Sequence, residues 1–396
     1  MRAAWIGWIV FCLLAALKTV LAVEDSPVNR SYSYGATLWW MHKDLYDGAG
    51  TGFIYLPQAA VLQLPFIFLP GPVHDFAWRI VTIGLLALGV WKLSRLGDRR
   101  AAVAIFPLVT LLTLPKTWTV AVNGQATPAM AGLMMLATGA IVQRRWWQGA
   151  AALLFALAFK PLAIVLVLLA GALSAPLRRK LAIGVAVFLL VPFLTQDSQY
   201  VFDQYVGFIE NLRDSSHVGR TIEWPQLFSL LQVLGLELSE QARLLTQVGA
   251  GVVTLVAAWQ ACRSFPARQA GLLVYSLATT YLLLLNPRTE NNTYSMLVPA
   301  MGVFAARELM ANRWSARGVF YLTLVGALTG GFEICKQFSP GSPFVWPCVA
   351  GCLAFACDLG LMIVRGPRTH GEAVDRALLA APAAESLSVS TGWRAV

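Results

Sequence analysis

Long apolar runs follow one another along almost the whole sequence, and they constrain the fold more than any other feature. Hydrophobic residues make up 57% of the 396 residues, whereas charged residues make up only 13%. A backbone placed in lipid must satisfy its own polar groups, so runs of this length are expected to form membrane-spanning helices. The sequence therefore predicts an all-α polytopic membrane protein.

We expect about 12 transmembrane helices, assigned from the length of each apolar run and from the polar connectors between runs. They lie near residues 4–22, 75–94, 101–117, 126–143, 147–159, 162–177, 181–195, 245–262, 268–285, 294–310, 317–333 and 345–364. The apolar segment 53–69 is broken by two prolines, and a full span there would place the basic cluster at 92–100 on the outer side. We therefore interpret this segment as interfacial or re-entrant.

The distribution of charge orients the protein in the membrane. Basic connectors such as 144–145 and 178–180 fall on one side of the proposed topology, whereas most acidic residues fall on the other. Basic loops remain in the cytoplasm, so the acidic loops are expected outside and both chain ends inside. The net charge of +10 arises from these connectors, which argues against nucleic acid as a partner and for the bilayer.

Polar residues concentrate in three outer loops, 23–74, 196–244 and 286–294, where we expect the active site. These loops belong to one transmembrane domain, residues 1–365, which is followed by a disordered cytoplasmic tail at 366–396. The inner connectors contain no glycine-rich nucleotide-binding motif. His, Cys and acidic residues show no metal-ligand spacing, so neither a metal nor another cofactor is predicted.

Two outer-face helices are expected to lie along the membrane interface. Residues 35–46 place Leu38, Met41 and Leu45 at helical spacing beside a pair of tryptophans. Residues 200–209 are rich in Tyr and Phe, which suit the same position. The aromatic residues could equally be plain membrane anchors.

An enzyme at the outer face needs an activated substrate that the membrane delivers, because soluble nucleotides are scarce there. A lipid-linked phosphosugar meets this need, and its transfer requires a carboxylate to accept the proton of the acceptor hydroxyl. Glu24 and Asp25 directly follow the first helix, and Asp44 lies between His42 and Tyr46. Each acid could also be a solvated flanking charge or a helix cap, so three candidate bases remain open.

Cationic and amide side chains would hold the departing phosphate. Lys160 stands at a Lys-Pro break between two apolar runs, where an ionisable residue is expected to be functional unless it snorkels to the interface. The other candidates for the phosphate are Arg288, Gln125 and Arg220. Candidates for the sugar or the acceptor are His42, Tyr55, Asn123, Glu223, Glu290 and Asn292.

Several short motifs occur in a fixed order. They are the acidic first outer loop, Asp44-Leu-Tyr46, Phe53-Ile-Tyr-Leu-Pro57, Asn123-Gly-Gln125 and Lys160-Pro161. In this order they resemble glycosyltransferase family 87, most strongly over residues 24–180 and more weakly at 286–294. The resemblance implies the GT-C membrane fold and the activity of the bacterial polyprenyl-phosphate-mannose-dependent alpha-mannosyltransferases.

The resemblance further implies an inverting transfer to a lipid or glycan acceptor of the cell envelope. The enzyme would lie in the bacterial inner (plasma) membrane, with its active site on the periplasmic face. A first-loop carboxylate would be the base, and Asp25 or Glu24 are the positions that match. The chain departs from the family at Asn29, near the place where the family commonly carries an Asp.

Two other functions remain open at this point. A transporter or flippase of a lipid-linked sugar would need polar residues at mid-membrane, and it often shows matching repeats in two halves. The sequence shows no such repeat. An inactive assembly partner is the other alternative, which the asparagine at position 29 keeps open.

Overall fold

The computed structural model describes residues 1–21, 27–46, 53–97, 102–218, 224–287, 289–312, 315–338 and 346–367. Within these ranges the chain is helical and contains no strand. The predicted all-α class is therefore confirmed.

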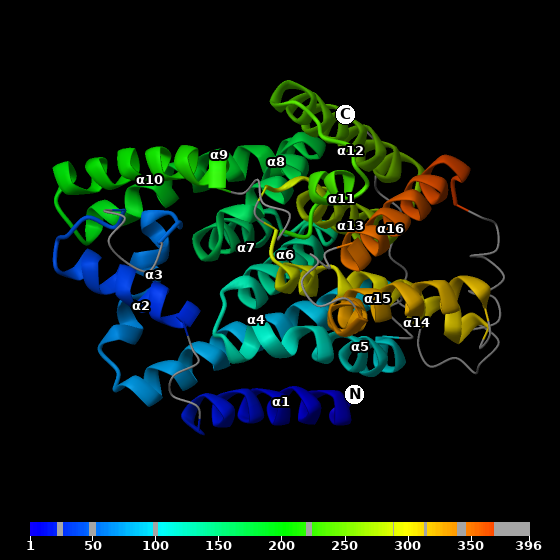
Figure 1. The fold of residues 1–396 in the computed structure, drawn as a ribbon, viewed down its shortest axis with the longest axis horizontal. Helices are drawn as coiled ribbons and strands as arrows, with labels where there is room; N and C mark the ends of the chain where they lie inside the picture. The colour runs from blue at the N-terminus through cyan, green and yellow to red at the C-terminus, as the bar shows by residue number, and fades with distance from the viewer. Residues whose placement is uncertain are drawn as a thin grey trace.

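The helices follow one another with short connections (Figure 1). The first half contains α1 (Arg2–Leu21), α2 (Pro27–Trp40), α3 (Pro57–Ile67), α4 (Gly71–Gly97), α5 (Ala102–Val122), α6 (Thr127–Val142), α7 (Trp146–Phe159), η1 (Pro161–Ala163), α8 (Ile164–Leu173) and α9 (Ala175–Leu190). The second half contains η2 (Val191–Leu194), α10 (Ser198–Val218), α11 (Leu227–Val233), α12 (Glu240–Ser264), α13 (Ala267–Leu285), η3 (Asn291–Met296), α14 (Val298–Ala311), α15 (Ala316–Phe338) and α16 (Trp346–Arg365).

Every predicted span overlaps one of these helices. Among the described residues, α4, α5, α12 and α16 are long and apolar enough to cross a membrane. The apolar helices α6 and α7, and the joined segment of η1 and α8, are shorter. Apolar spans are thus confirmed, whereas the total of about 12 spans and the GT-C type stay predictions.

Small residues let α4 and α6 approach each other closely at the centre of the bundle. A Cβ added at Gly89 of α4 would lie 2.6 Å from the Cα of Gly132 of α6. A Cβ added at Gly132 would lie 2.2 Å from the carbonyl oxygen of Leu85. Lipid provides no hydrophobic drive for helices to associate, so close packing of this kind contributes much of the stability of a membrane bundle.

The predicted interfacial segment 53–69 contains α3, an 11-residue helix that is shorter than the ~20 residues of a span. Pro57 occupies its first turn, where the missing N–H is not needed. The buried Gln58 donates to the carbonyl of Phe188 and to the hydroxyl of Tyr205, so α3 is fixed to α9 and α10.

The first outer-loop helix differs from its prediction. It was expected at 35–46, but α2 runs from Pro27 to Trp40. Proline favours the beginning of a helix, and His42 adopts a φ of 58°, which is outside the helical range. The side chain of Trp39 is buried, and its indole N–H donates to Thr195. Helix α2 is therefore packed against protein on that face, and its predicted position at the membrane interface stays a prediction.

Helix α10 confirms that the predicted residues 200–209 are helical, and it lies beside α2 and α3 at one end of the molecule (Figure 1). Gln204 accepts from the backbone N–H of Leu45, and Tyr200 donates to the carbonyl of Lys43. The three helices thus form one connected group.

We expect Gly89→Ala to destabilise the protein more than Gly84→Ala, although both glycines lie in α4. The added methyl group at Gly89 meets α6 backbone, whereas nothing lies within 4 Å of a Cβ at Gly84. Overpacking of this kind costs about 1–3 kcal/mol. Thermal unfolding in detergent measures the difference, and equal midpoints for the two variants would contradict the close α4–α6 contact.

Candidate active site

The turn between α5 and α6 is the centre of the candidate site. Gly124 has a φ of 63°, a left-handed conformation that glycine adopts readily. A Cβ at this position would also lie 2.9 Å from the Cβ of Asn29. Helix α6 then begins at Thr127. The tight turn predicted from Asn123-Gly-Gln125 is confirmed.

A buried lysine and a buried amide flank the end of this turn. Lys160 is 8% exposed, and its Nζ donates to Oγ1 of Thr127 at 3.0 Å. Gln125 is 4% exposed, and its Nε2 donates to Oε2 of Glu290 at 3.1 Å. The other amide atom, Oε1 of Gln125, accepts no hydrogen bond from any residue that the structure describes. The structure thus brings together three of the predicted site residues, Lys160, Gln125 and Glu290.

The local sequence explains the position of Lys160. It lies between α7 and η1 in an extended conformation, as expected for a residue that precedes proline. Its burial lowers the pKa of the ammonium, and the negative charge of Glu290 opposes this shift. The site therefore holds a desolvated cation, which is a strong electrostatic partner for an anion.

Two tyrosines line the same turn. Tyr32 of α2 donates its hydroxyl to that of Tyr55 at 2.8 Å, and the backbone N–H of Ala126 donates to Tyr32 at 3.3 Å. Their ring centroids lie 4.7 Å apart. Burial raises the pKa of Tyr32, and its neighbour Tyr55 adds to the effect, so the Tyr32 hydroxyl remains a protonated donor. Tyr55 was predicted as a sugar or acceptor contact.

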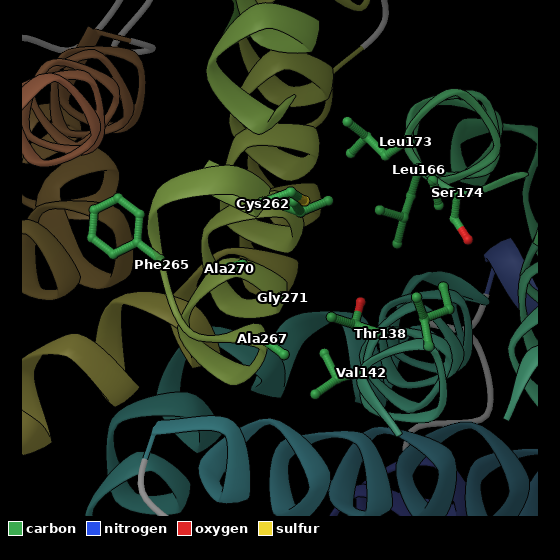
Figure 2. Close-up of a pocket in the computed structure, with 13 residues that line it drawn as sticks. Thr138, Val142, Leu166, Leu173, Ser174, Cys262, Phe265, Ala267, Ala270 and Gly271 are labelled. Carbon is green, nitrogen blue, oxygen red and sulfur yellow. The ribbon is translucent and has the colours of Figure 1, made fainter. Parts of the chain in front are cut away.

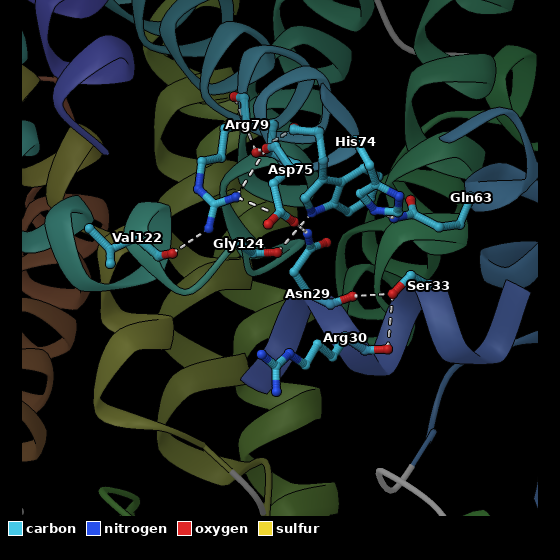
Figure 3. Close-up of polar contacts among 11 residues, drawn as sticks. Asn29, Arg30, Ser33, Gln63, His74, Asp75, Arg79, Val122 and Gly124 are labelled. Atoms are coloured by element: carbon cyan, nitrogen blue, oxygen red, sulfur yellow. Dashed lines mark hydrogen bonds and ion pairs between the residues drawn. The ribbon is translucent and has the colours of Figure 1, made fainter. Parts of the chain in front are cut away.

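A second polar group holds the other side of the turn (Figure 3). The guanidinium of Arg79 is fully buried, and its Nη2 donates to the carbonyl of Val122 at 2.6 Å. Its Nη1 lies 3.8 Å from Oδ1 of Asp75. The Nδ2 of Asn29 donates to the same carboxylate oxygen. Three separate elements, α2, α4 and the end of α5, therefore meet through Arg79 and Asp75.

Trp78 links the two sides of the site. Its indole N–H donates to the carbonyl of Gly124 at 2.8 Å. Its ring packs against Phe159, the residue before Lys160, with ring centroids 5.6 Å apart, and against Tyr32 at 5.7 Å. The turn, the lysine and the tyrosines thus share one aromatic support.

A second buried lysine approaches the site from α5. Lys116 donates its Nζ to Oδ1 of Asn291 at 2.9 Å, and the thiol of Cys348 donates to the same oxygen at 3.0 Å. Asn291 directly follows Glu290 in the chain. Lys116 of α5 and Lys160, which lies between α7 and η1, are therefore both near the beginning of η3.

His42 and Asp44 lie at the other end of α2. The ring of His42 stacks on Tyr200 with centroids 4.2 Å apart, and its Nε2 lies 3.2 Å from Oδ2 of Asp197. Asp44 is exposed, and its Oδ1 accepts from the backbone N–H of Tyr46. Both residues fasten the end of α2 and the following turn, so the structure does not join them to the Lys160 group.

The remaining predicted residues are less informative. Asn123 and Asn292 are half-buried near the turn and η3. The predicted site residues Glu24, Asp25, Arg220, Glu223 and Arg288 lie outside the described residues. Within the described ranges, no three His, Cys, Asp or Glu side chains are grouped so that they could hold a metal ion.

An apolar cavity of about 60 Å³ lies elsewhere, among α6, α8, α12 and α13 (Figure 2). Its lining is mainly aliphatic, with hydroxyl groups only from Thr138 and Ser174. None of the predicted site residues lines it. It therefore offers no group for glycosyl or phosphoryl chemistry.

Four residues of the site were missed by sequence reasoning. They are Tyr32, Asp75, Arg79 and Lys116. A signal existed for Arg79 and Lys116, because each is a charge inside an expected span, where ionisable residues are usually functional. Asp75 stands at the first residue of its expected span, so it resembled a flanking charge.

Comparison with known families identifies the class of protein. Residues 53–287, which are more than half of the chain, match the model of glycosyltransferase family 87. The match and the apolar helices together define a membrane glycosyltransferase. The chain belongs to glycosyltransferase family 87, as its motifs predicted. No curated protein matches the sequence.

We expect Gly124→Ala to lower the unfolding temperature more than Gly235→Ala. Both glycines have positive φ, but a Cβ meets Asn29 only at Gly124, and nothing lies within 4 Å of it at Gly235. The left-handed backbone costs about 1–2 kcal/mol in both variants, and crowding adds about 1–3 kcal/mol at Gly124. Thermal unfolding in detergent checks this order, and the reverse order would show that the turn is not held tightly against α2.

Proposed function

We propose that this protein transfers a sugar, mannose according to its family resemblance, from a polyprenyl-phosphate donor to a lipid or glycan acceptor. The transfer takes place with inversion on the extracytoplasmic face of a bacterial plasma membrane. The observation that carries the proposal is the buried Lys160 beside the amide of Gln125, at a break between apolar helices. The ammonium donates to the neutral hydroxyl of Thr127 and lies near the charge of Glu290, so it can bind a further anion.

The donor phosphate is the anion that fits. A polyprenyl tail partitions into lipid, so its phosphate reaches a site enclosed by apolar helices. As the bond from the sugar to the phosphate breaks, negative charge grows on the phosphate oxygen. A fixed cation in a site of low dielectric stabilises that charge without reorganisation. Lys160 and the Nε2 of Gln125 therefore act on the leaving group, and Lys116 is a further cation close by.

Hydroxyl-binding groups surround the same position. The hydroxyls of Tyr32 and Tyr55, the free Oε1 of Gln125 and the carboxylate of Glu290 offer donors and acceptors in the pattern that a sugar requires. A buried acceptor without a partner costs about 1–3 kcal/mol, and a ligand hydroxyl that donates to it removes this cost. A sugar hydroxyl thus supplies the hydrogen bond that Oε1 of Gln125 lacks.

The transfer requires a base as well as a phosphate site. The oxygen of the acceptor hydroxyl forms a bond to the anomeric carbon, and its proton passes to a carboxylate. The electron pair of the broken bond remains on the phosphate. Asp25, Glu24 and Asp44 are the bases proposed from the sequence, and variants of each belong in any test of the reaction.

The proposal is tested by transfer from radiolabelled polyprenyl-phosphate-mannose in nanodiscs, with native membrane lipids as acceptors. We expect label in a new glycolipid. Lys160→Met should raise the donor KM about 10- to 100-fold, because a hydrogen bond to a charged group contributes about 1.5–3 kcal/mol. Lys18→Met is the matched control, since Lys18 is exposed at the end of α1, and it should stay within about twofold.

Transport of the intact donor across the membrane is the outcome that would contradict the transfer proposal. Movement of intact donor between the leaflets of sealed vesicles, without transfer of label, would replace this proposal with a flippase. Absence of both signals, with several polyprenyl-phosphate sugars supplied, would leave an assembly partner as the function.

We also expect donor binding to weaken with rising pH. The lowered pKa of Lys160 means that its ammonium loses a proton at a lower pH than an ordinary lysine, whereas a phosphodiester keeps its charge. Lys160→Arg keeps its cation over the whole range, so its donor KM should change less with pH. Donor KM is measured from about pH 6 to about pH 10, below the ordinary lysine pKa of about 10.4. Parallel profiles for wild type and Lys160→Arg would exclude this lysine as the titrating group.

A further inference from the structure

A carboxylate that no sequence motif indicated lies on the Asn29 side of the central turn. Asp75 stands near the beginning of α4, and its side chain is 34% exposed. The guanidinium of Arg79, one helical turn further on, is completely buried beside it. Figure 3 shows the carboxylate between Asn29 and Arg79, close to the carbonyl of Gly124. The acid is thus reachable by a substrate while it rests on a buried support.

One oxygen of this carboxylate is held and the other is available. Oδ1 accepts from the Nδ2 of Asn29 and lies 3.8 Å from the Nη1 of Arg79. Among the described residues, none donates a hydrogen bond to Oδ2 of Asp75. A carboxylate oxygen accepts protons only where its lone pairs are not already used. Asp75 is therefore oriented by protein groups through Oδ1 and has a free acceptor in Oδ2.

The turn between α5 and α6 connects the Asp75 carboxylate to the proposed donor site. Asn29 packs on Gly124, and Arg79 binds the carbonyl of Val122. The next residue after Gly124 is Gln125, whose amide belongs to the proposed phosphate and sugar site. The acid and the donor-binding amide are thus fixed to consecutive parts of one rigid connection, as a base and a leaving-group site must be.

The other described acids near this region are engaged differently. Oε2 of Glu290 accepts from Gln125, and its charge acts on Lys160. Asp44 uses its Oδ1 to hold the turn at Tyr46. Among these acids, Asp75 alone combines a neighbouring buried cation with solvent exposure beside the central turn.

We infer that Asp75 is the general base of the transfer reaction. The inference rests on the proposed function and adds to it the group that activates the acceptor. Oδ2 of Asp75 accepts the proton of the acceptor hydroxyl while the hydroxyl oxygen bonds to the anomeric carbon. The bond between that carbon and the phosphate oxygen breaks, and its electron pair leaves with the phosphate held near Lys160. Asn29 and Arg79 are positioning residues, which hold the carboxylate in one orientation.

The decisive variant is Asp75→Asn, compared with wild type in the nanodisc transfer assay. Its Oδ1 still accepts from Asn29, so the local packing is kept. We expect kcat to fall about 10²- to 10⁴-fold, the contribution of general-base catalysis, with the donor KM within about threefold. Asp203→Asn removes an exposed acid of α10 whose carboxylate accepts only from Gln199 of the same helix, and it should retain wild-type turnover. Glu24→Gln, Asp25→Asn and Asp44→Asn compare the bases predicted from the sequence.

Chemical rescue separates a base from a structural acid. Asp75→Ala removes the carboxylate and leaves space, so formate or azide should restore part of the lost turnover in that variant. The same anions should not restore Lys160→Met. Size-exclusion profiles and unfolding temperatures of the two Asp75 variants verify that they fold.

The outcomes are distinct for the two proposals. Wild-type transfer together with a kcat of Asp75→Asn within threefold of wild type would overturn the role of Asp75 and leave the glycosyltransferase proposal intact. Loss of turnover without rescue, or loss caused by unfolding in both Asp75 variants, would make Asp75 structural and overturn its role as well. Absence of transfer by the wild type would overturn both proposals.

Discussion

The site depends on the contacts that the buried guanidinium of Arg79 makes. It binds a carbonyl at the end of α5 and faces Asp75 on its own helix, and Asp75 in turn receives the amide of Asn29 from α2. A buried cation without partners is very costly, so these contacts reinforce one another. The turn that carries Gly124, Gln125 and the beginning of α6 is consequently fixed in one arrangement.

The same constraint explains why polar residues gather at one place in a chain that is otherwise apolar. Each buried charge in lipid surroundings requires neighbours that satisfy it, and those neighbours must be supplied by other helices. Lys160 therefore meets Thr127 of α6, and Lys116 meets Asn291 of η3. The result is a preorganised electropositive region within helices whose outer faces remain apolar. Such a region suits a substrate whose charge and tail lie in the same molecule.

The sequence was sufficient for the helices and for part of the site. The apolar runs predicted the helices because length and hydropathy decide what can exist in lipid, and the motif order identified the family. Lys160 and Gln125 were predicted because a proline or a glycine accompanies them, and the structure places both beside the central turn. Asp75 and Tyr32 carried no such signal, since their importance arises from contacts between α2, α4 and the turn, which are distant in sequence. The bounds of α2 were wrong because hydrophobic spacing continues past its end, where the backbone at His42 changes direction.

Helix α2 has a mechanical consequence of its own. It is 14 residues long, which makes it a rod of about 21 Å. Asn29 near its first turn contacts the central turn, while His42 just beyond its last turn is stacked on α10 and paired with Asp197. A displacement of α10 would therefore move one end of α2, whose other end contains Asn29 and Tyr32. The contacts at the two ends of this one helix thus connect α10 mechanically to the central turn, although the two lie apart.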